Sequence, residues 1–313
     1  MLSRVAAQLY WLSRYLERAE NMARILEVGQ SFALLSSSQA DVEQNDAVSE
    51  PLVITDTLGA FEQTKRPMRA DQVAQFLAWD PSHPSSIVNC LKACRENARA
   101  VRGAMTVEMW ECINDTWLEL MARQKTHQGR ELPVDSGFFE WIKQRSHLFR
   151  GVTFATIQRD QPYLFIRLGT YLERADNTAR MLDVKYDPLA PEPSPGNEYY
   201  EWGALLRSVS AFEIYRRVYR DVITPERVAE LLVLRADMPR SLRACMEEVH
   251  ATLKIIANSQ SAETERRAGE LHAELHFGRI DTILASGLHE MLTDFLGRTA
   301  DLGNRISADF LVP

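Results

Sequence analysis

Apolar residues recur along most of the chain at the spacing of an α-helix, most clearly in residues 3–35. On a helical wheel the apolar residues of this segment fall on one arc, made of Leu9, Leu12, Leu16, Ala19, Ala23 and Leu26. Ser3 is a suitable N-cap, and the polar stretch 36–50 predicts a loop after the helix. No persistent alternating pattern indicates a sheet, so the sequence predicts an all-α protein.

The same periodicity predicts two further series of helices. The first series is expected at about 52–65, 70–79, 84–104, 106–124 and 137–158. The second is expected at about 161–186, 199–220, 225–235, 239–257, 262–277 and 280–311. The Pro-rich segment 187–196 is predicted to be a loop.

The two series resemble each other because the sequence repeats. Residues 11–28 (WLSRYLERAENMARILEV) and 167–184 (RLGTYLERADNTARMLDV) are identical at eleven of 18 positions, at an offset of 156. Weaker matches pair 60–62 with 211–213, Pro84, Ser86 and Cys90 with Pro239, Ser241 and Cys245, and Gly137 and Glu140 with Gly287 and Glu290. We therefore expect an internally duplicated helical bundle. Its two units of about six helices, 1–158 and 159–313, would pack as one compact body about a pseudo-two-fold axis.

Each copy of the repeat carries a line of polar residues roughly opposite the apolar arc. The line consists of Glu17, Asn21 and Arg24 with Arg18 on its flank, and of Glu173, Asn177 and Arg180 with Arg174 on its flank. These residue types are the same in both copies, whereas neighbours such as Trp11 and Arg167 differ. Three interpretations remain open: a buried, paired network, a contact with a ligand or partner, and a solvated face with local ion pairs. On the first, each Glu and its arginines should form charge-assisted networks near where the two units meet.

The segments MLSRVAAQLYWLSRYLERAENMARIL and FIRLGTYLERADNTARMLDVKY resemble the two motifs of the alpha-E family, helical proteins named for a Glu-Arg motif. The resemblance extends over essentially the whole chain. It maps the motif onto Glu17, Arg18, Glu173 and Arg174 and implies no established catalytic role for them. The family is associated with circularly permuted ATP-grasp proteins, a class of carboxylate–amine ligases, and with transglutaminase-like peptidases. That association implies a role in making or modifying peptides.

Composition and charge narrow the function further. The 313 residues include 36 basic and 43 acidic side chains, a net charge of −7, which disfavours a general nucleic-acid binder. The sequence contains no run of 18 apolar residues, so we expect no membrane contact. Its four cysteines form no CxxC pair, which is typical of a reducing compartment and predicts a cytoplasmic protein. Cys90 and Cys245, at matching positions, are predicted to pack in the core.

Motifs for phosphate binding and nucleophilic catalysis are missing from the sequence, so we predict no cofactor. A di-iron bundle needs two Glu-x-x-His motifs, and the chain has one, Glu247 to His250. His272 and His276 are spaced to share a metal on one helix face, but two histidines are more typical of an ordinary helix surface or core. We predict no metal site and leave this pair open.

The function expected from the sequence and the resemblance together is that of a non-catalytic partner. The protein would dock a circularly permuted ATP-grasp ligase or hold its peptide substrate or product. The alternative is an enzyme in its own right that acts on a peptide or other anionic substrate at the Glu/Arg motif. In either case the residues chosen for an anion contact are Arg18, Arg24, Arg174 and Arg180, because guanidinium groups match carboxylates and phosphates.

Overall fold

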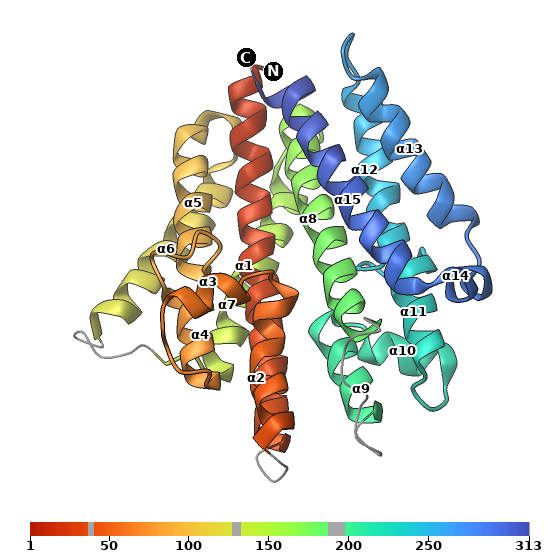
Figure 1. The fold of residues 1–313 in the computed structure, drawn as a ribbon. Coiled ribbons are helices and arrows are strands. Elements are labelled where there is room, and N and C mark those ends of the chain that lie inside the picture. Colours follow the sequence, from red (N-terminus) through yellow and green to blue (C-terminus); the bar gives the residue numbers. More distant parts are fainter. Residues whose placement is uncertain (37–40, 127–132, 187–197, 313) are drawn as a thin grey trace. The chain divides into compact units, whose positions relative to one another are not determined.

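The computed structural model describes residues 1–36, 41–126, 133–186 and 198–312, and the regular elements in these ranges are all helical (Figure 1). The predicted all-α class is confirmed. The chain folds into two compact units: unit 1 contains Met1 and residues 8–166, and unit 2 contains residues 2–7 and 167–313. The division falls inside the helix that begins at Gln161, eight residues after the boundary expected at 158/159.

The helices of unit 1 are α1 (Ser3–Ser36), α2 (Asp41–Ile54), α3 (Leu58–Gln63), α4 (Ala70–Trp79), α5 (Ile87–Ala100), α6 (Val107–Thr126) and α7 (Ser136–Thr156), with a 3₁₀ turn at Arg102–Ala104. In this unit α5 packs on α6, and α6 packs on α7. The helices of unit 2 are α8 (Gln161–Tyr186), α9 (Glu198–Ser208), α10 (Phe212–Tyr219), α11 (Pro225–Leu234), α12 (Leu242–Ile256), α13 (Ala262–Phe277), α14 (Ile280–Ser286) and α15 (Leu288–Ile306), followed by a π-helical turn, Ser307–Leu311. Here α12 and α13 form the most extensive pair, and α13 also packs on α15 (Figure 1).

The loop predicted at 36–50 is wrong over residues 41–50, which begin α2; residues 37–40 lie outside the described part, as does the predicted Pro-rich loop 187–196. The helix is polar at its start but buries Val48, Leu52 and Ile54 near its end. It lies close to α1 at Gly29, where a Cβ atom would meet the ring of Pro51 at 2.8 Å.

Two predicted helices, 52–65 and 199–220, are each broken in the middle. Asp56 and Ser210 adopt left-handed backbone with φ of 54° and 55°. After each one, a backbone N–H bonds to the carbonyl five residues back: Thr57 to Leu52 at 2.8 Å, and Ala211 to Leu206 at 2.7 Å. This Schellman geometry satisfies the last carbonyls of α2 and α9, so each helix stops there without a glycine.

The breaks recur at an offset of 154, which pairs Phe61 with Tyr215 rather than with Phe212, the residue expected from the sequence match. Both aromatic rings are buried, at 1% and 0% exposure. At an offset of 155, Ser86 and Ser241 cap α5 and α12, and each Oγ accepts from the backbone N–H three residues on. The starts predicted at 84 and 239 are therefore three residues early.

The last predicted helix, 280–311, is interrupted at Gly287, which has a φ of 99°. This backbone conformation favours glycine, and a Cβ atom there would also force the Glu290 carboxylate, 2.0 Å away, to move aside. Gly287 and Gly137, which were matched in sequence, occupy different positions relative to their helices. Gly137 is the second residue of α7, whereas Gly287 precedes α15.

The apolar arc predicted for the first helix is buried along its whole length, from Leu9 to Leu26. Cys90 and Cys245 are fully buried, as predicted. From Ala19 to Leu26, however, every residue of α1 is buried, polar ones included. No helix in the described ranges is both long enough and apolar enough to cross a membrane.

Candidate functional site

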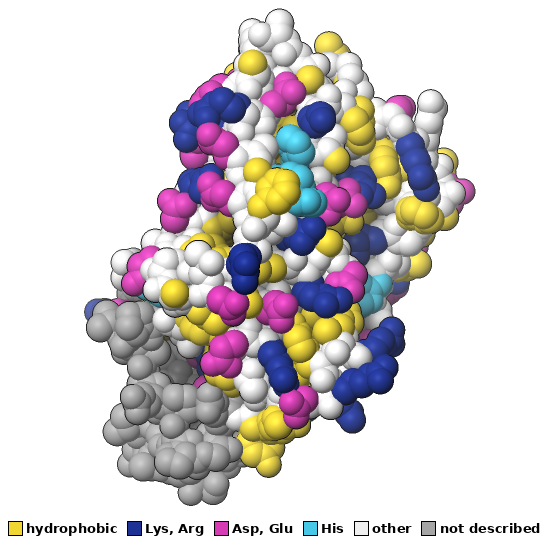
Figure 2. All heavy atoms as spheres, turned by 90° about the vertical axis from the view of Figure 1, so that its right-hand side faces the viewer, with side chains coloured by type: hydrophobic (Ala, Val, Ile, Leu, Met, Phe, Trp, Pro, Cys, Tyr) yellow, Lys and Arg dark blue, Asp and Glu magenta, His cyan; other side chains and the backbone are white. Residues whose placement is uncertain are grey.

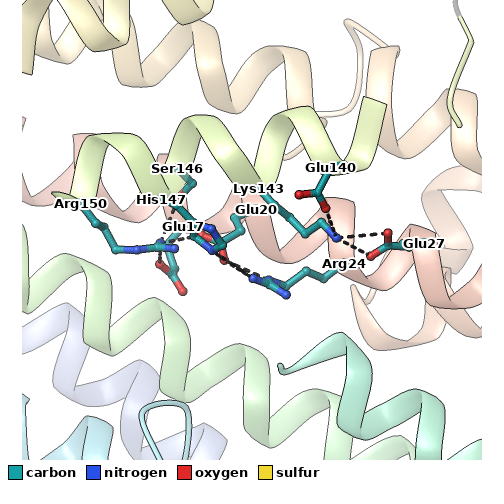
Figure 3. Close-up of polar contacts among 9 residues, drawn as sticks. All are labelled: Glu17, Glu20, Arg24, Glu27, Glu140, Lys143, Ser146, His147 and Arg150. Atoms are coloured by element: carbon teal, nitrogen blue, oxygen red, sulfur yellow. Dashed lines mark hydrogen bonds and ion pairs between the residues drawn. The ribbon is translucent and has the colours of Figure 1, made fainter. Parts of the chain in front are cut away.

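Charged side chains of α1 and α7 meet along the two helices in unit 1 (Figure 3). We call this set the charged ladder; it contains Glu17, Glu20, Arg24 and Glu27 from α1 and Glu140, Lys143, His147 and Arg150 from α7. Asp135 caps α7 by accepting from the Phe138 N–H at 2.9 Å and so fixes where this helix begins. The ladder is buried at Glu17 and becomes more exposed towards Glu140.

At the buried end one guanidinium holds two carboxylates. Arg150 Nη1 lies 2.9 Å from Glu17 Oε2 and 2.5 Å from Glu20 Oε2, and it also donates to Ser146 Oγ at 3.0 Å. Glu17 and Glu20 are 1% and 0% exposed. They lie one helical turn apart, so their negative charges would repel at low dielectric without a shared cation. Arg150 supplies that cation.

The middle of the ladder joins Arg24, Glu20 and His147. Arg24 Nε donates to Glu20 Oε1 at 2.9 Å, and Arg24 Nη2 lies 3.3 Å from His147 Nε2. His147 Nε2 is 3.5 Å from Glu20 Oε1, and its side chain is 55% exposed. A neutral Nε2 accepts from Arg24, whereas a protonated one pairs with Glu20, so this ring connects the buried charges to solvent.

The exposed end is centred on Lys143. Its Nζ lies 2.9 Å from both Glu27 Oε2 and Glu140 Oε2. Burial lowers the pKa of Lys143, but hydrogen bonds to Glu140 and Glu27 outweigh it and hold the pKa above its ordinary value. The hydrogen bond from Lys143 in turn lowers the pKa of Glu140. Lys143 and Glu140 are therefore both charged at neutral pH.

The predicted polar line of the first copy is thus buried and paired, and the solvated-face interpretation is wrong for it. Glu17, Asn21 and Arg24 are 1%, 3% and 5% exposed. Glu17 is paired with Arg150, a residue that the sequence interpretation had not selected. Arg18 lies apart from the ladder: its Nη1 donates to Ser85 Oγ at 3.4 Å, and its guanidinium is 5.8 Å from the Tyr15 ring.

The second copy is placed on α8 in unit 2. Glu173 and Arg174 are 5% and 7% exposed, and the Arg174 guanidinium lies 5.2 Å from the Tyr171 ring. Arg180 Nε donates to Asp176 Oδ2 at 2.9 Å, the same pairing as Arg24 with Glu20, but the Arg180 side chain is 39% exposed.

Asn177 Nδ2 lies 3.2 Å from Met181 Sδ. Further along α8, Asp183 Oδ1 lies 2.8 Å from His289 Nδ1 of α15. In each unit an acidic residue of the motif helix therefore lies close to a side-chain nitrogen of a later helix, Lys143 in unit 1 and His289 in unit 2.

The two units differ at the position that Arg150 occupies in unit 1. The inward-facing residues of α7 and α15 match at an offset of 153: Phe139, Ile142, Ser146, Phe149 and Thr153 against Leu292, Phe295, Thr299, Leu302 and Ile306. At this offset Gly303 stands in place of Arg150, and Ala300 in place of His147. The guanidinium that bridges two carboxylates in unit 1 therefore has no counterpart on α15.

The loops before α5 and α12 also differ in charge. In unit 1, Asp80 pairs with Arg66. Burial raises the pKa of Asp80, but the hydrogen bonds from Ser82 and the positive charge of Arg66 outweigh this effect and lower the pKa. His83 of the same loop is 5% exposed, and burial lowers its pKa. In unit 2 the same loop carries the buried Arg240, 6% exposed, which has no basic counterpart in unit 1.

The histidines weighed as metal ligands lie on α12 and α13. The rings of His250 and His272 stack at 5.0 Å and 10°, and the rings of His272 and His276 are 5.3 Å apart. Across the described ranges, no three or more His, Cys, Asp or Glu side chains are grouped so as to hold a metal ion.

The sequence matches, over residues 1–311, a family model described as a predicted alpha-helical domain with a conserved ER motif. It is also similar to uncharacterized proteins of Mycobacterium bovis and Mycobacterium tuberculosis. Each is 26% identical over 317 residues, which is 94% of this chain but 35% of the relative. The chain thus spans about a third of the length of these relatives. No solved structure matches it.

Proposed function

Because the chain belongs to the Alpha-E family, we propose that it is a non-catalytic helical subunit that docks a circularly permuted ATP-grasp ligase or presents its peptide substrate or product. The observation that carries the proposal is the state of the motif in unit 1. Glu17 and Glu20 are buried and share Arg150, and Arg24 is held by Glu20. A general acid or base must reach its substrate, so these pairings favour a scaffold role over a catalytic one.

The length of the relatives adds support. A segment of 317 residues makes up 35% of the mycobacterial proteins, so in them a domain of this kind belongs to a longer polypeptide. A helical domain that works beside another domain fits a role as a partner, in one chain or in two. The ligase as partner, and peptide synthesis or modification as its purpose, come from the family resemblance.

Internal duplication belongs to the same proposal. The Schellman breaks, the serine caps and the inward-facing residues recur at offsets of 154, 155 and 153, although few side chains are shared there. Duplication of one helical unit would give these recurrences. The differences at Arg150 and Arg240 would then have arisen after the duplication.

Exposure selects among the four arginines proposed for an anion contact. Arg24 and Arg174 are 5% and 7% exposed, so a bound anion would have to displace existing packing. Arg180 is 39% exposed, and Arg18 is half-buried, so an anion can reach both guanidinium groups. We therefore assign an anion contact, such as a carboxylate of the peptide, to Arg18 and Arg180.

Co-purification with the ATP-grasp ligase encoded nearest this chain tests the proposal, followed by ligase assays with and without the chain. We expect association at micromolar concentration and ligase turnover that depends on the chain. Arg18→Glu and Arg180→Glu should weaken association or turnover, whereas the control Arg99→Glu, at a 64% exposed residue paired with Glu96, should not. Turnover of a peptide by this protein alone, without association, would reject the proposal in favour of an enzyme.

A further inference from the structure

The arginines of unit 2 divide into two classes by their contacts. Those of α13 and α15 are paired with acidic residues, for example Arg266 with Glu263 at 2.7 Å and Arg305 with Asp301 at 2.8 Å. Arg216, Arg217 and Arg220, at the end of α10, are exposed, and their side chains make no hydrogen bond, ion pair or ring contact with any described residue. We call these three the α10 arginines.

The α10 arginines lie on the exposed side of the helix and at its C-terminal end. Arg216 and Arg217 are about 100° apart on a helical wheel and point away from Tyr215, which is fully buried. Arg220 is the C-cap residue and has left-handed backbone, with a φ of 52°. Glu213 lies on the same exposed face but makes no ion pair with them, and the nearby Asp221 is occupied by Arg227 at 2.8 Å. The face therefore keeps a net positive charge on a chain whose net charge is −7.

Figure 2 looks onto the side where α10 to α14 lie in Figure 1, and lysine and arginine side chains gather at its lower right with few acidic ones among them. Apolar side chains are available close to α10 in the sequence: Val222 is 63% exposed, and Tyr199 and Tyr200 at the start of α9 are 48% and 57% exposed.

The fold itself does not require this charge. At the offset of 154 set by the helix breaks, Arg216 and Arg217 correspond to Glu62 and Gln63 of α3, and Arg220 corresponds to Arg66, which is paired with Asp80. Cations near a helix C-terminus stabilise it through the helix dipole, but unit 1 builds the matching helix without them. Like charges one turn apart carry a small cost that an anionic partner would relieve.

We propose that the exposed face of α10 binds a short acidic segment of a polypeptide. Each guanidinium offers a planar pair of donors that matches a carboxylate, and the exposed Val222 offers apolar contact. A polypeptide is favoured over nucleic acid because its apolar side chains can pack on Val222, whereas a phosphate backbone offers no such contact. The inference is independent of the ligase, since it concerns only the chemistry of the bound segment.

A fluorescence anisotropy titration tests the proposal, with a labelled Glu-rich decapeptide containing two Leu as the probe. A peptide with Gln in place of Glu and a single-stranded DNA 10-mer serve as comparisons. We expect the full chain to bind the acidic peptide at low salt and to bind it more weakly as salt rises. Arg216→Gln with Arg217→Gln should weaken binding about fivefold or more, as expected for two charged contacts.

The matched control is Arg266→Gln with Arg267→Gln, which removes the same charge from another adjacent exposed pair in unit 2. When both variants are compared at moderate salt, about 0.1 M, the control should bind within about twofold of the parent, because the non-specific effect of net charge is then largely screened. Circular dichroism should show both variants folded. No binding by the parent, equal loss in both variants, equal binding of the Gln peptide, or preference for the DNA would each overturn the proposal.

Discussion

Arg150 Nη1 of α7 lies 2.9 Å from Glu17 Oε2 of α1, although the two residues are 133 positions apart in the sequence. The same nitrogen lies 2.5 Å from Glu20, so one side chain neutralises two carboxylates that are almost fully buried. Arg150 is therefore the cation that Glu17 and Glu20 share, and Glu20 is also paired with Arg24 at 2.8 Å. The stability of unit 1 should depend on Arg150, because removing it takes a cation away from both carboxylates.

Replacing Arg150 with Met tests this dependence. Removing one partner of a buried pair costs about 3–5 kcal/mol. Because Arg150 is 29% exposed, water can enter after the change, and we expect a loss near the lower end, about 3 kcal/mol, in the free energy of unfolding measured with urea. Arg99→Met breaks an exposed pair and should cost less than about 1 kcal/mol. Similar losses in the two variants would contradict a buried role for Arg150.

A second prediction compares two glycines in helices. At Gly29 of α1 a Cβ atom would lie 2.8 Å from the Pro51 ring of α2, whereas at Gly151 of α7 nothing lies within 4 Å. Gly29→Ala should destabilise the protein by about 1–3 kcal/mol, because the two helices must move apart. Gly151→Ala should stabilise it by about 0.5–1 kcal/mol, because alanine favours the helix. Thermal unfolding of both variants measures the signs, and a stable Gly29→Ala protein would show that α2 does not pack closely here.

The predictability of the fold and of the site differs for a physical reason. The apolar arc of α1 repeats at helical spacing within one continuous segment, so its burial could be predicted from the sequence alone. The network around Glu17 depends on Lys143 and Arg150, which lie 116 and 133 positions beyond their partners, and no local pattern connects them. The helix breaks cannot be predicted from the sequence because Asp56 and Ser210 adopt left-handed backbone, a conformation usually marked by glycine.

A third prediction concerns the stacked histidines His250 and His272 of α12 and α13. Figure 2 shows histidine side chains in the upper half of the face that it draws. Burial lowers the pKa of His250 and of His272, and the neighbouring imidazoles add to the effect. Lys254 and Arg243 act in the same direction, whereas Glu265 and Glu247 oppose it. Both rings are therefore neutral in the folded protein at pH 7.

The unfolded chain takes up protons on these rings first as pH falls through 6.5, the ordinary histidine value, so the folded state loses stability over that interval. We expect a lower melting temperature at pH 5.5 than at pH 7.5. His272→Gln should reduce the difference, because it removes one titrating ring and relieves the other. Buried His83 titrates in the same direction and should leave part of the effect in the variant. An unchanged pH profile in His272→Gln would contradict the assignment.

The break after α2 gives the last prediction. Asp56 has a φ of 54°, a conformation that costs most residues about 1–2 kcal/mol and costs glycine nothing. Aspartate tolerates it better than most, and glycine gains flexibility in the unfolded chain, so Asp56→Gly should raise the free energy of unfolding by only about 0.5 kcal/mol. Glu62→Gly, at an exposed position inside α3, should lower it by about 1 kcal/mol. Urea unfolding of the two variants measures both signs. If Asp56→Gly destabilises the protein as much as Glu62→Gly, the chain at residue 56 is not left-handed, and α2 continues towards α3 as the sequence pattern alone would have it.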